Sequence, residues 1–272
     1  MNGLLAAAPP MDEAADLERR FGGLRRLYGD AVYARIRAAH IVVVGVGGVG
    51  SWCAEALARS GVGALTLIDL DHVSESNINR QVQALGATLG QAKVDALRAR
   101  IADIHPGCAV TAVEEFVDAD NWPALLPARP VDAVIDACDQ GRAKAVLAAW
   151  ALGTGVPLVI VGAAGGKREA QAVAVDDLGL VTHDPMLASL RQRLRKHHGA
   201  ARGGRIGLRC VYSSEPVHLP AAADCDRDSS LNCHGYGSSV AVTATFGMVA
   251  ASLAIELLQA ASDRASEPAG YN

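Results

Sequence analysis

One segment constrains the fold of this chain more than any other: a glycine-rich loop between a β-branched run and a stretch with helical character. Residues 41–44 predict a buried parallel strand, and residues 51–59 predict a helix that ends before Gly61. The loop between them holds Gly45, Gly47, Gly48 and Gly50. A strand, a glycine turn and a helix N-terminus together direct backbone N–H groups at an anion. The sequence therefore predicts an α/β unit that binds a phosphate-bearing ligand.

A second strand and the acid that follows it leave the kind of nucleotide open. Residues 64–68 predict the next strand, and Asp69 stands at its C-terminal end. A carboxylate about twenty residues beyond such a loop commonly binds ribose hydroxyls. These features alone fit an NAD-binding domain, so an NAD-dependent oxidoreductase is one alternative.

Two cations and a further acid favour a triphosphate. Arg80 lies in a predicted loop, Lys93 at the start of a predicted helix, and Asp139 just past the predicted strand 131–135. A guanidinium and an ammonium stabilise charge that develops on phosphates during displacement. A carboxylate near phosphates can hold magnesium, whereas hydride transfer needs no cation pair at a triphosphate. Each residue alone is an ordinary surface charge. Following Asp69 in this order, they predict a site that binds ATP and cleaves it at the α-phosphate.

The order of these motifs resembles the ubiquitin-activating-enzyme-like superfamily of ATP-dependent adenylating enzymes, the ThiF/MoeB type. The Ser-Asn-x-x-Arg-Gln segment of that family matches residues 76–81. The resemblance implies that Arg80 and Lys93 are catalytic cations at the phosphates and that Asp139 is the magnesium ligand. The nucleotide-binding set that it implies is Gly45, Gly47, Gly48, Gly50, Asp69, Asp71, Asn77, Arg80, Lys93 and Asp139.

Further segments resemble one branch of the superfamily, the dehydratases that cyclise threonylcarbamoyladenosine in tRNA. The matching segments are 20–29, 162–166, 210–215 and 242–247, within a resemblance over residues 19–258. It implies an adenylating ligase or cyclase in which a substrate carboxylate is adenylated by ATP and ring closure then expels AMP. It implies a Rossmann-like, largely parallel α/β sheet with helices on both faces and ATP at the C-terminal strand ends. It also implies tRNA as partner and a homodimer, and leaves open a monovalent cation and a sulfur-relay protein of the cysteine desulfurase system.

Two departures from the superfamily bear on zinc and on the partner subunit. Sulfur-carrier-activating relatives hold zinc with two Cys-x-x-Cys pairs, but the six cysteines here form no such pair. We therefore expect no zinc and favour the dehydratase branch over adenylation of a ubiquitin-like sulfur carrier, which stays the first alternative. Many relatives also carry, where this chain has Gly23, an arginine that reaches ATP in the partner subunit. Arg20 and Arg26 are the candidates to replace it.

One cysteine is a candidate for covalent chemistry. Cys233 lies in a glycine-rich stretch beside His234. A thiolate there can attack an acyl adenylate, or the cysteine can serve only the structure of a loop. Ring closure within the substrate does not require a covalent cysteine step, so both interpretations stay open.

A basic segment suits contacts with tRNA phosphates. Between Asp184 and Glu215 the chain carries seven lysines and arginines and no acid. The alternative is a solvated basic helix face, and a non-enzymatic tRNA-binding module is the corresponding weaker alternative for the whole chain. The candidate tRNA-binding residues are Arg191, Arg193, Arg195, Lys196, Arg202 and Arg205.

Composition and the chain ends complete the predicted organisation. Residues 1–15 lack the features of a signal peptide and are predicted to be a flexible arm. A single adenylating domain is predicted over 16–260, with a basic insertion around 186–210 and a flexible tail over 261–272. Residues 240–258 approach the length that spans a bilayer, but their many small and hydroxyl side chains favour a helix in a soluble core or dimer interface. Dispersed cysteines and a net charge of −4 fit a cytoplasmic enzyme without a membrane partner.

Overall fold

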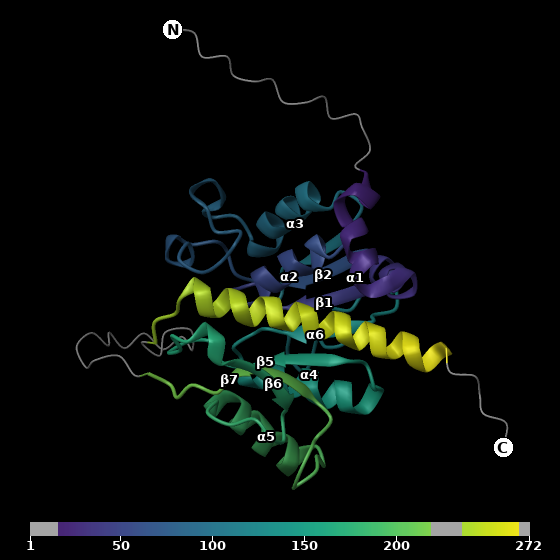
Figure 1. The fold of residues 1–272 in the computed structure, drawn as a ribbon. Coiled ribbons are helices and arrows are strands. Elements are labelled where there is room, and N and C mark those ends of the chain that lie inside the picture. Colours follow the sequence, from purple (N-terminus) through teal and green to yellow (C-terminus); the bar gives the residue numbers. More distant parts are fainter. Residues whose placement is uncertain (1–15, 219–235, 267–272) are drawn as a thin grey trace, which may run out of the picture.

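The computed structural model describes residues 16–218 and 236–266, of which 261–266 are described by backbone alone. Its centre is a seven-stranded sheet in the order β3-β2-β1-β4-β5-β7-β6 (Figure 1). The strands are β1 (His40–Val44), β2 (Ala64–Ile68), β3 (Ala109–Val113), β4 (Ala133–Asp136), β5 (Leu158–Val161), β6 (Val173–Asp177) and β7 (Arg209–Ser213). All neighbours pair in parallel except β6, which runs antiparallel to β7 at one edge. The strand order reverses between β1 and β4, and in open α/β sheets ligands bind beside such a reversal.

Six helices flank the sheet in the described part of the chain (Figure 1). They are α1 (Leu17–Ala38), α2 (Gly50–Arg59), α3 (Lys93–Ile104), α4 (Gly141–Thr154), α5 (Pro185–His197) and α6 (Val240–Ser266). Three short 3₁₀ helices add to them, η1 (Glu75–Asn77), η2 (Gly86–Thr88) and η3 (Ala170–Ala172).

Alternating residues of the central strands divide the core into two layers. In β1, Ile41 and Val43 pack with α1, α2, α3 and α6, whereas Val42 and Val44 pack with α4 and α5. This division follows from the period of two along a strand, because successive side chains point to opposite faces. Both faces are covered, as a parallel sheet requires. The predicted fold, a largely parallel Rossmann-like sheet with helices on both faces, is confirmed.

The predicted apolar helix forms α6, which runs along α1 and α2 in Figure 1. A Cβ at Gly247 would lie 2.6 Å from the carbonyl oxygen of Val49, so glycine allows α6 to pack directly against the backbone of α2. By length and composition alone the stretch Val240–Ala260 suffices to cross a membrane, but half of it is buried inside the protein. The predicted flexible tail begins at residue 261, within the last turns of this helix. The helix continues to Ser266, because no proline or glycine interrupts the sequence between Gly247 and Pro268.

The basic segment is part of the same core. Leu187, Leu190 and Leu194 of α5 are buried in the layer that α5 shares with α4. The segment then leads into β7, which pairs with both β5 and β6. Residues 186–210 therefore pack within the domain, and their description as a basic insertion stays a prediction.

Candidate nucleotide-binding site

The glycine loop follows β1 at the sheet reversal, and its shape depends on the absence of side chains. Gly45 has φ of +83°, and a Cβ there would lie 2.8 Å from the backbone nitrogen of Cys138. A Cβ at Gly50 would lie 1.8 Å from the carbonyl oxygen of Gly45. Because no larger residue fits either position, the loop turns tightly from β1 into α2.

Several amide groups of the loop have no partner in the described chain. The N–H groups of Gly45 and Val46 donate to Ile68 O and to Asp69 Oδ2. Within the described residues, the N–H groups of positions 47–50 donate to no protein acceptor. They begin α2, whose N-cap residue makes no side-chain cap. Unsatisfied donors and the positive end of a helix dipole together form a site for an anion.

Asp69 connects the end of β2 to this loop. Its Oδ2 accepts from the Val46 N–H at 2.7 Å, and its Oδ1 accepts from the Asp71 N–H at 3.0 Å. The carboxylate is 8% exposed, and burial raises the pKa of Asp69 against the opposing effect of Lys93. A carboxylate has about four acceptor positions, so each oxygen of Asp69 can still accept a hydroxyl. This position fits the predicted contact with a ribose.

Lys93 lies beside the second acid. Its Nζ forms an ion pair with Asp71 Oδ2 at 2.6 Å, and its N–H donates to the Asp71 carbonyl at 2.9 Å. The ammonium is almost fully buried, whereas the Asp71 side chain is half exposed. Asp71 therefore holds the start of α3 and the Lys93 charge next to Asp69. The contact of Lys93 with phosphates stays a prediction.

Arg80 lies across the glycine loop. A Cβ at Gly48 would meet the Arg80 side-chain stem at 3.3 Å, so the guanidinium stem crosses the loop at this residue. Its Nη1 donates to Ser76 O at 2.8 Å and to Asn79 Oδ1 at 3.0 Å. The Arg80 carbonyl accepts from Trp52 Nε1 at 2.9 Å. Among the described residues, Nε and Nη2 of Arg80 have no acceptor and are available for a ligand.

Asn77 shapes the segment that carries Arg80. Its Oδ1 accepts from the Ser74 N–H at 3.1 Å, and its carbonyl accepts from the N–H groups of Arg80 and Gln81. Its side chain is buried. The structure therefore gives Asn77 a role in the turn, and its predicted contact with the nucleotide stays a prediction.

Asp139 is exposed and lies three residues beyond the end of β4. No group of three or more His, Cys, Asp or Glu side chains gathers into a metal cluster in the described residues. Magnesium usually takes one or two carboxylates together with phosphate oxygens and waters rather than an all-protein cage. A single accessible carboxylate near the glycine loop fits that requirement.

The sequence did not reveal two buried polar groups beside the site. Gln83 is 1% exposed, and its Nε2 donates to Val46 O at 2.9 Å and to Gln81 Oε1 at 3.2 Å, so Gln83 holds the carbonyl of Val46 while Asp69 holds its N–H. Behind Asp139, Asp136 pairs with Lys144 in the interior of the protein. Gln83 and Lys144 belong to no recognised motif, and although Asp136 begins the segment that leads to Asp139, only the packing reveals its pairing with Lys144.

Other predicted site residues lie elsewhere. Cys233 lies outside the described residues. Arg20 donates from Nη1 to the carbonyls of Asp103 and Ile104 at 2.8 and 2.6 Å, which engages it at the end of α3. Both candidates for an arginine that reaches the partner subunit are exposed, and Arg26 makes no side-chain hydrogen bond or ion pair within the described residues.

The six basic residues predicted to bind tRNA fall into two groups. Arg191 Nη1 donates to Leu178 O and Val181 O, Arg195 Nε donates to Ala201 O, and Arg205 lies 3.9 Å from Asp176. These three cations support loops or contact an acid that is distant in sequence. The remaining cations are exposed and have no partner in the described chain: Arg193, Lys196 and Arg202.

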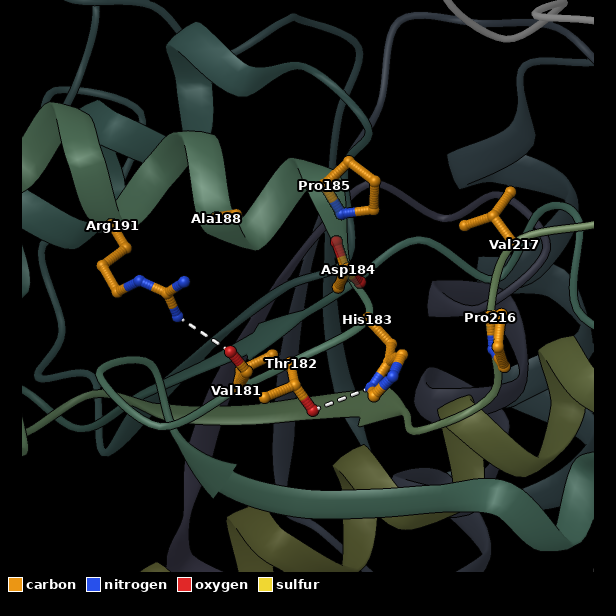
Figure 2. A pocket seen from close by; sticks show the side chains of 9 residues that line it. All are labelled: Val181, Thr182, His183, Asp184, Pro185, Ala188, Arg191, Pro216 and Val217. Carbon is orange, nitrogen blue, oxygen red and sulfur yellow. Dashed lines mark hydrogen bonds between the residues drawn. The ribbon is translucent and has the colours of Figure 1, made fainter.

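A cavity of about 410 Å³ lies at the start of α5 and away from the glycine loop. Figure 2 shows Arg191 on α5 directed toward the Val181 carbonyl, with Thr182 and His183 on the adjoining loop. The cavity is lined by Val181, Thr182, His183, Asp184, Pro185, Ala188, Arg191, Pro216 and Val217. None of the predicted nucleotide-binding residues lines it.

This chain is similar to known proteins over nearly its whole length, well beyond the residues of the candidate nucleotide site. The model of the ThiF family matches residues 20–271. The tRNA threonylcarbamoyladenosine dehydratase of Escherichia coli (strain K12) is 42% identical over 257 residues, which cover 90% of this chain and 96% of that protein. The crystal structure of the E. coli dehydratase, TcdA, in complex with ATP matches with a TM-score of 0.83 over 92% of this chain and 98% of that one. By contrast, the Molybdopterin-synthase adenylyltransferase of E. coli is 37% identical over 124 residues, 46% of this chain and 49% of that protein.

Proposed function

This chain belongs to the ThiF family, and we propose that it catalyses the ATP-dependent dehydration of threonylcarbamoyladenosine in tRNA. The observation that carries the proposal is the extent of the similarity. It covers 90% of the chain for the E. coli dehydratase and 46% for the adenylyltransferase. The geometry supports an adenylation step. The free amides of the glycine loop follow β1, Asp69 follows β2 and Asp139 follows β4, and the predicted cations Arg80 and Lys93 lie between β2 and β4 in the sequence.

We propose that the phosphates of ATP bind the free N–H groups of residues 47–50, with the ribose hydroxyls donating to Asp69. Arg80 crosses the loop at Gly48 and has free N–H groups to direct at the phosphates. Lys93 adds a second positive charge near Asp69. Preorganised charges of this kind need no rearrangement as the reaction proceeds.

In the proposed reaction a carboxylate oxygen of the substrate's threonine attacks the α-phosphorus of ATP. The bond between the α-phosphorus and the oxygen that bridges to the β-phosphate breaks, and pyrophosphate leaves. An amide group of the same substrate then attacks the activated carbonyl carbon, loses its proton and expels AMP. The net result is a ring and the loss of one water. Arg80 and Lys93 stabilise the negative charge on the phosphates, and magnesium held with Asp139 would add further positive charge there.

We further propose that tRNA lies along α5 and the loop that follows it. Arg193, Lys196 and Arg202 are exposed and unpaired in the described chain, so they supply the cations that contact phosphates. The other basic residues of the segment hold its shape. This division narrows the predicted tRNA surface from six residues to three.

We propose that the protein works as a cytoplasmic homodimer. Exposed apolar side chains support a second copy as partner. Leu85 and Leu89, in the segment between β2 and α3, are 51% and 43% exposed, and Met248 of α6 is 43% exposed. Because α6 also packs Val242 and Phe246 into the core, we assign it to the protein interior and an interface rather than to a bilayer.

The exchange of labelled pyrophosphate into ATP tests the proposed function. Exchange should depend on tRNA that carries threonylcarbamoyladenosine, and a sulfur-carrier protein ending in Gly-Gly should not replace it. Arg80→Ala and Asp139→Ala should each lower exchange by about 10²–10³ while the melting temperature stays near that of the wild type. Exchange driven by the Gly-Gly protein alone would favour the sulfur-carrier alternative.

A further inference from the structure

A lysine that no motif includes is buried directly behind the candidate site. Lys144 lies in the first turns of α4 and has no exposed surface, and its helix neighbours Ala143, Ala145, Leu147 and Ala148 belong to the buried layer on this side of the sheet. Lysines are almost never fully buried unless they are paired, because an ammonium loses its hydration. The position therefore calls for a specific reason.

All donors of Lys144 are used at the ends of two neighbouring strands. Its Nζ donates to Asp136 Oδ1 at 3.1 Å, to the Asp136 carbonyl at 3.4 Å and to the Val161 carbonyl at 2.8 Å. Asp136 ends β4 and Val161 ends β5. Burial alone would lower the pKa of Lys144, but attraction to Asp136 and the hydrogen bond to its carboxylate outweigh burial and raise that pKa. The lysine is therefore a permanent charge that joins the carboxyl ends of β4 and β5.

Asp136 in turn holds the residues that lead to Asp139. Its Oδ1 accepts from the Cys138 N–H at 3.3 Å and from the Cys138 thiol at 3.0 Å. The Ala137 N–H donates to the Val44 carbonyl at 2.8 Å, and the backbone of Cys138 lies against Gly45. Residues 137 and 138 are thus fixed from β1, from the glycine loop and from the ion pair. Asp139 is the next residue and is exposed.

The ion pair between Lys144 and Asp136 is not explained by a contribution to stability. Asp136 Oδ2 is buried and has no hydrogen-bond partner among the residues described. A buried pair that is incompletely satisfied is often matched or exceeded in stability by apolar residues of similar volume. We therefore relate the pair to the segment that it holds in place, residues 137 and 138.

We propose that Lys144 is a positioning residue that acts through Asp136 to hold Asp139 at the magnesium–ATP site. This inference rests on the proposed function, in which Asp139 holds magnesium. Without the lysine, Asp136 loses the charge that fixes its carboxylate. The turn at residues 137 and 138 then relaxes, and Asp139 no longer meets the metal on the phosphates at a fixed distance.

The test compares Lys144→Met with the double variant Lys144→Met/Asp136→Leu. The single variant leaves a buried carboxylate uncompensated and should lose stability, whereas the double variant replaces the pair by apolar side chains and should melt near the wild type. Two quantities are measured for each protein: the rise in melting temperature caused by ATP with magnesium over ATP with EDTA, and the magnesium concentration that gives half-maximal pyrophosphate exchange. In the double variant we expect the magnesium-dependent rise to be lost and the half-maximal concentration to increase at least about tenfold.

Two control variants separate positioning from stability. Arg100→Met breaks the pair between Arg100 of α3 and the buried Glu55 of α2, so it should lower the melting temperature and leave the magnesium dependence unchanged. Asp139→Asn should shift the magnesium dependence as strongly as the double variant does. If the double variant keeps the magnesium dependence of the wild type while Asp139→Asn shifts it, the role proposed for Lys144 is overturned and the assignment of Asp139 stands. If Asp139→Asn leaves the magnesium dependence unchanged, both the role of Lys144 and the assignment of Asp139 are overturned.

Discussion

Adding one methyl group at Gly47 separates nucleotide binding from folding. Gly47 does not adopt a positive φ, and a Cβ there would have only Gln81 Nε2 near it, at 3.9 Å. The alanine therefore fits the protein, and we expect the free energy of unfolding of Gly47→Ala to change by no more than about 0.5 kcal/mol. The open space beside the loop is where the proposed site accommodates phosphates, so the methyl group should collide with ATP.

The size of the loss follows from the contacts of the loop. A hydrogen bond to a charged group contributes about 1.5–3 kcal/mol, and a phosphate displaced by a methyl group should lose one or two such bonds to the amides of residues 47–50. Losing one such bond lowers the affinity for ATP by about 10-fold to 150-fold, and losing two, about 3–6 kcal/mol, lowers it by about 150-fold to 25,000-fold.

Calorimetric titration with ATP and magnesium measures this affinity, and urea denaturation measures stability. Gly153→Ala is the matched control. Gly153 lies in α4, has no neighbour within 4 Å of an added Cβ and is not at positive φ. It should gain up to about 1 kcal/mol of stability from helix propensity and bind ATP as the wild type does. Wild-type affinity in Gly47→Ala would refute the assignment of the loop to the phosphates.

Gly247→Ala should cost about 1–3 kcal/mol in urea denaturation, because its Cβ would lie 2.6 Å from the Val49 carbonyl oxygen; an unchanged midpoint would show that α2 and α6 separate freely. Burial lowers the pKa of His40, so the unfolded chain binds a proton below about pH 6.5 that the folded protein does not. Stability should therefore fall as the pH drops through that value, and less steeply in His40→Gln; equal slopes would contradict this. Changing Arg193, Lys196 and Arg202 to glutamine should reduce the log–log salt slope of tRNA binding by about 2–3 and leave ATP binding unchanged, and an unaltered slope would place the tRNA surface elsewhere.

The sequence predicted those parts of the fold that depend on local pattern. The β-branched residues 41–44 and the run 64–68 became β1 and β2, and the glycine loop stands between β1 and α2. The loop was predictable because only glycine permits its close approach to Cys138. The order of the polar motifs predicted a nucleotide site, and the residues in that prediction follow β1, β2 and β4 beside the sheet reversal.

The residues that sequence reasoning missed or misjudged depend on long-range packing. Lys144 is one cation in an apolar helix, and only the pairing of β4 with β5 brings Asp136 and Val161 to its ammonium. Similarly, Arg191 looks like a free surface cation in the sequence, yet the chain returns after β6 to offer it two carbonyls. The segment from Asp184 to Glu215 contains no acid, but the fold places an acid of β6 near it. Local sequence does not specify such contacts.

The proposed activity is defined by the product that forms on tRNA. The direct measurement is mass spectrometry of the nucleosides of tRNA bearing threonylcarbamoyladenosine, after incubation with the protein, ATP and magnesium, together with quantification of AMP and pyrophosphate. The proposed reaction predicts conversion to a cyclic nucleoside that has lost one water. It also predicts release of one AMP and one pyrophosphate from ATP for each molecule converted, and no conversion without ATP. Unchanged nucleoside, or conversion accompanied by ADP and phosphate in place of AMP and pyrophosphate, would contradict it.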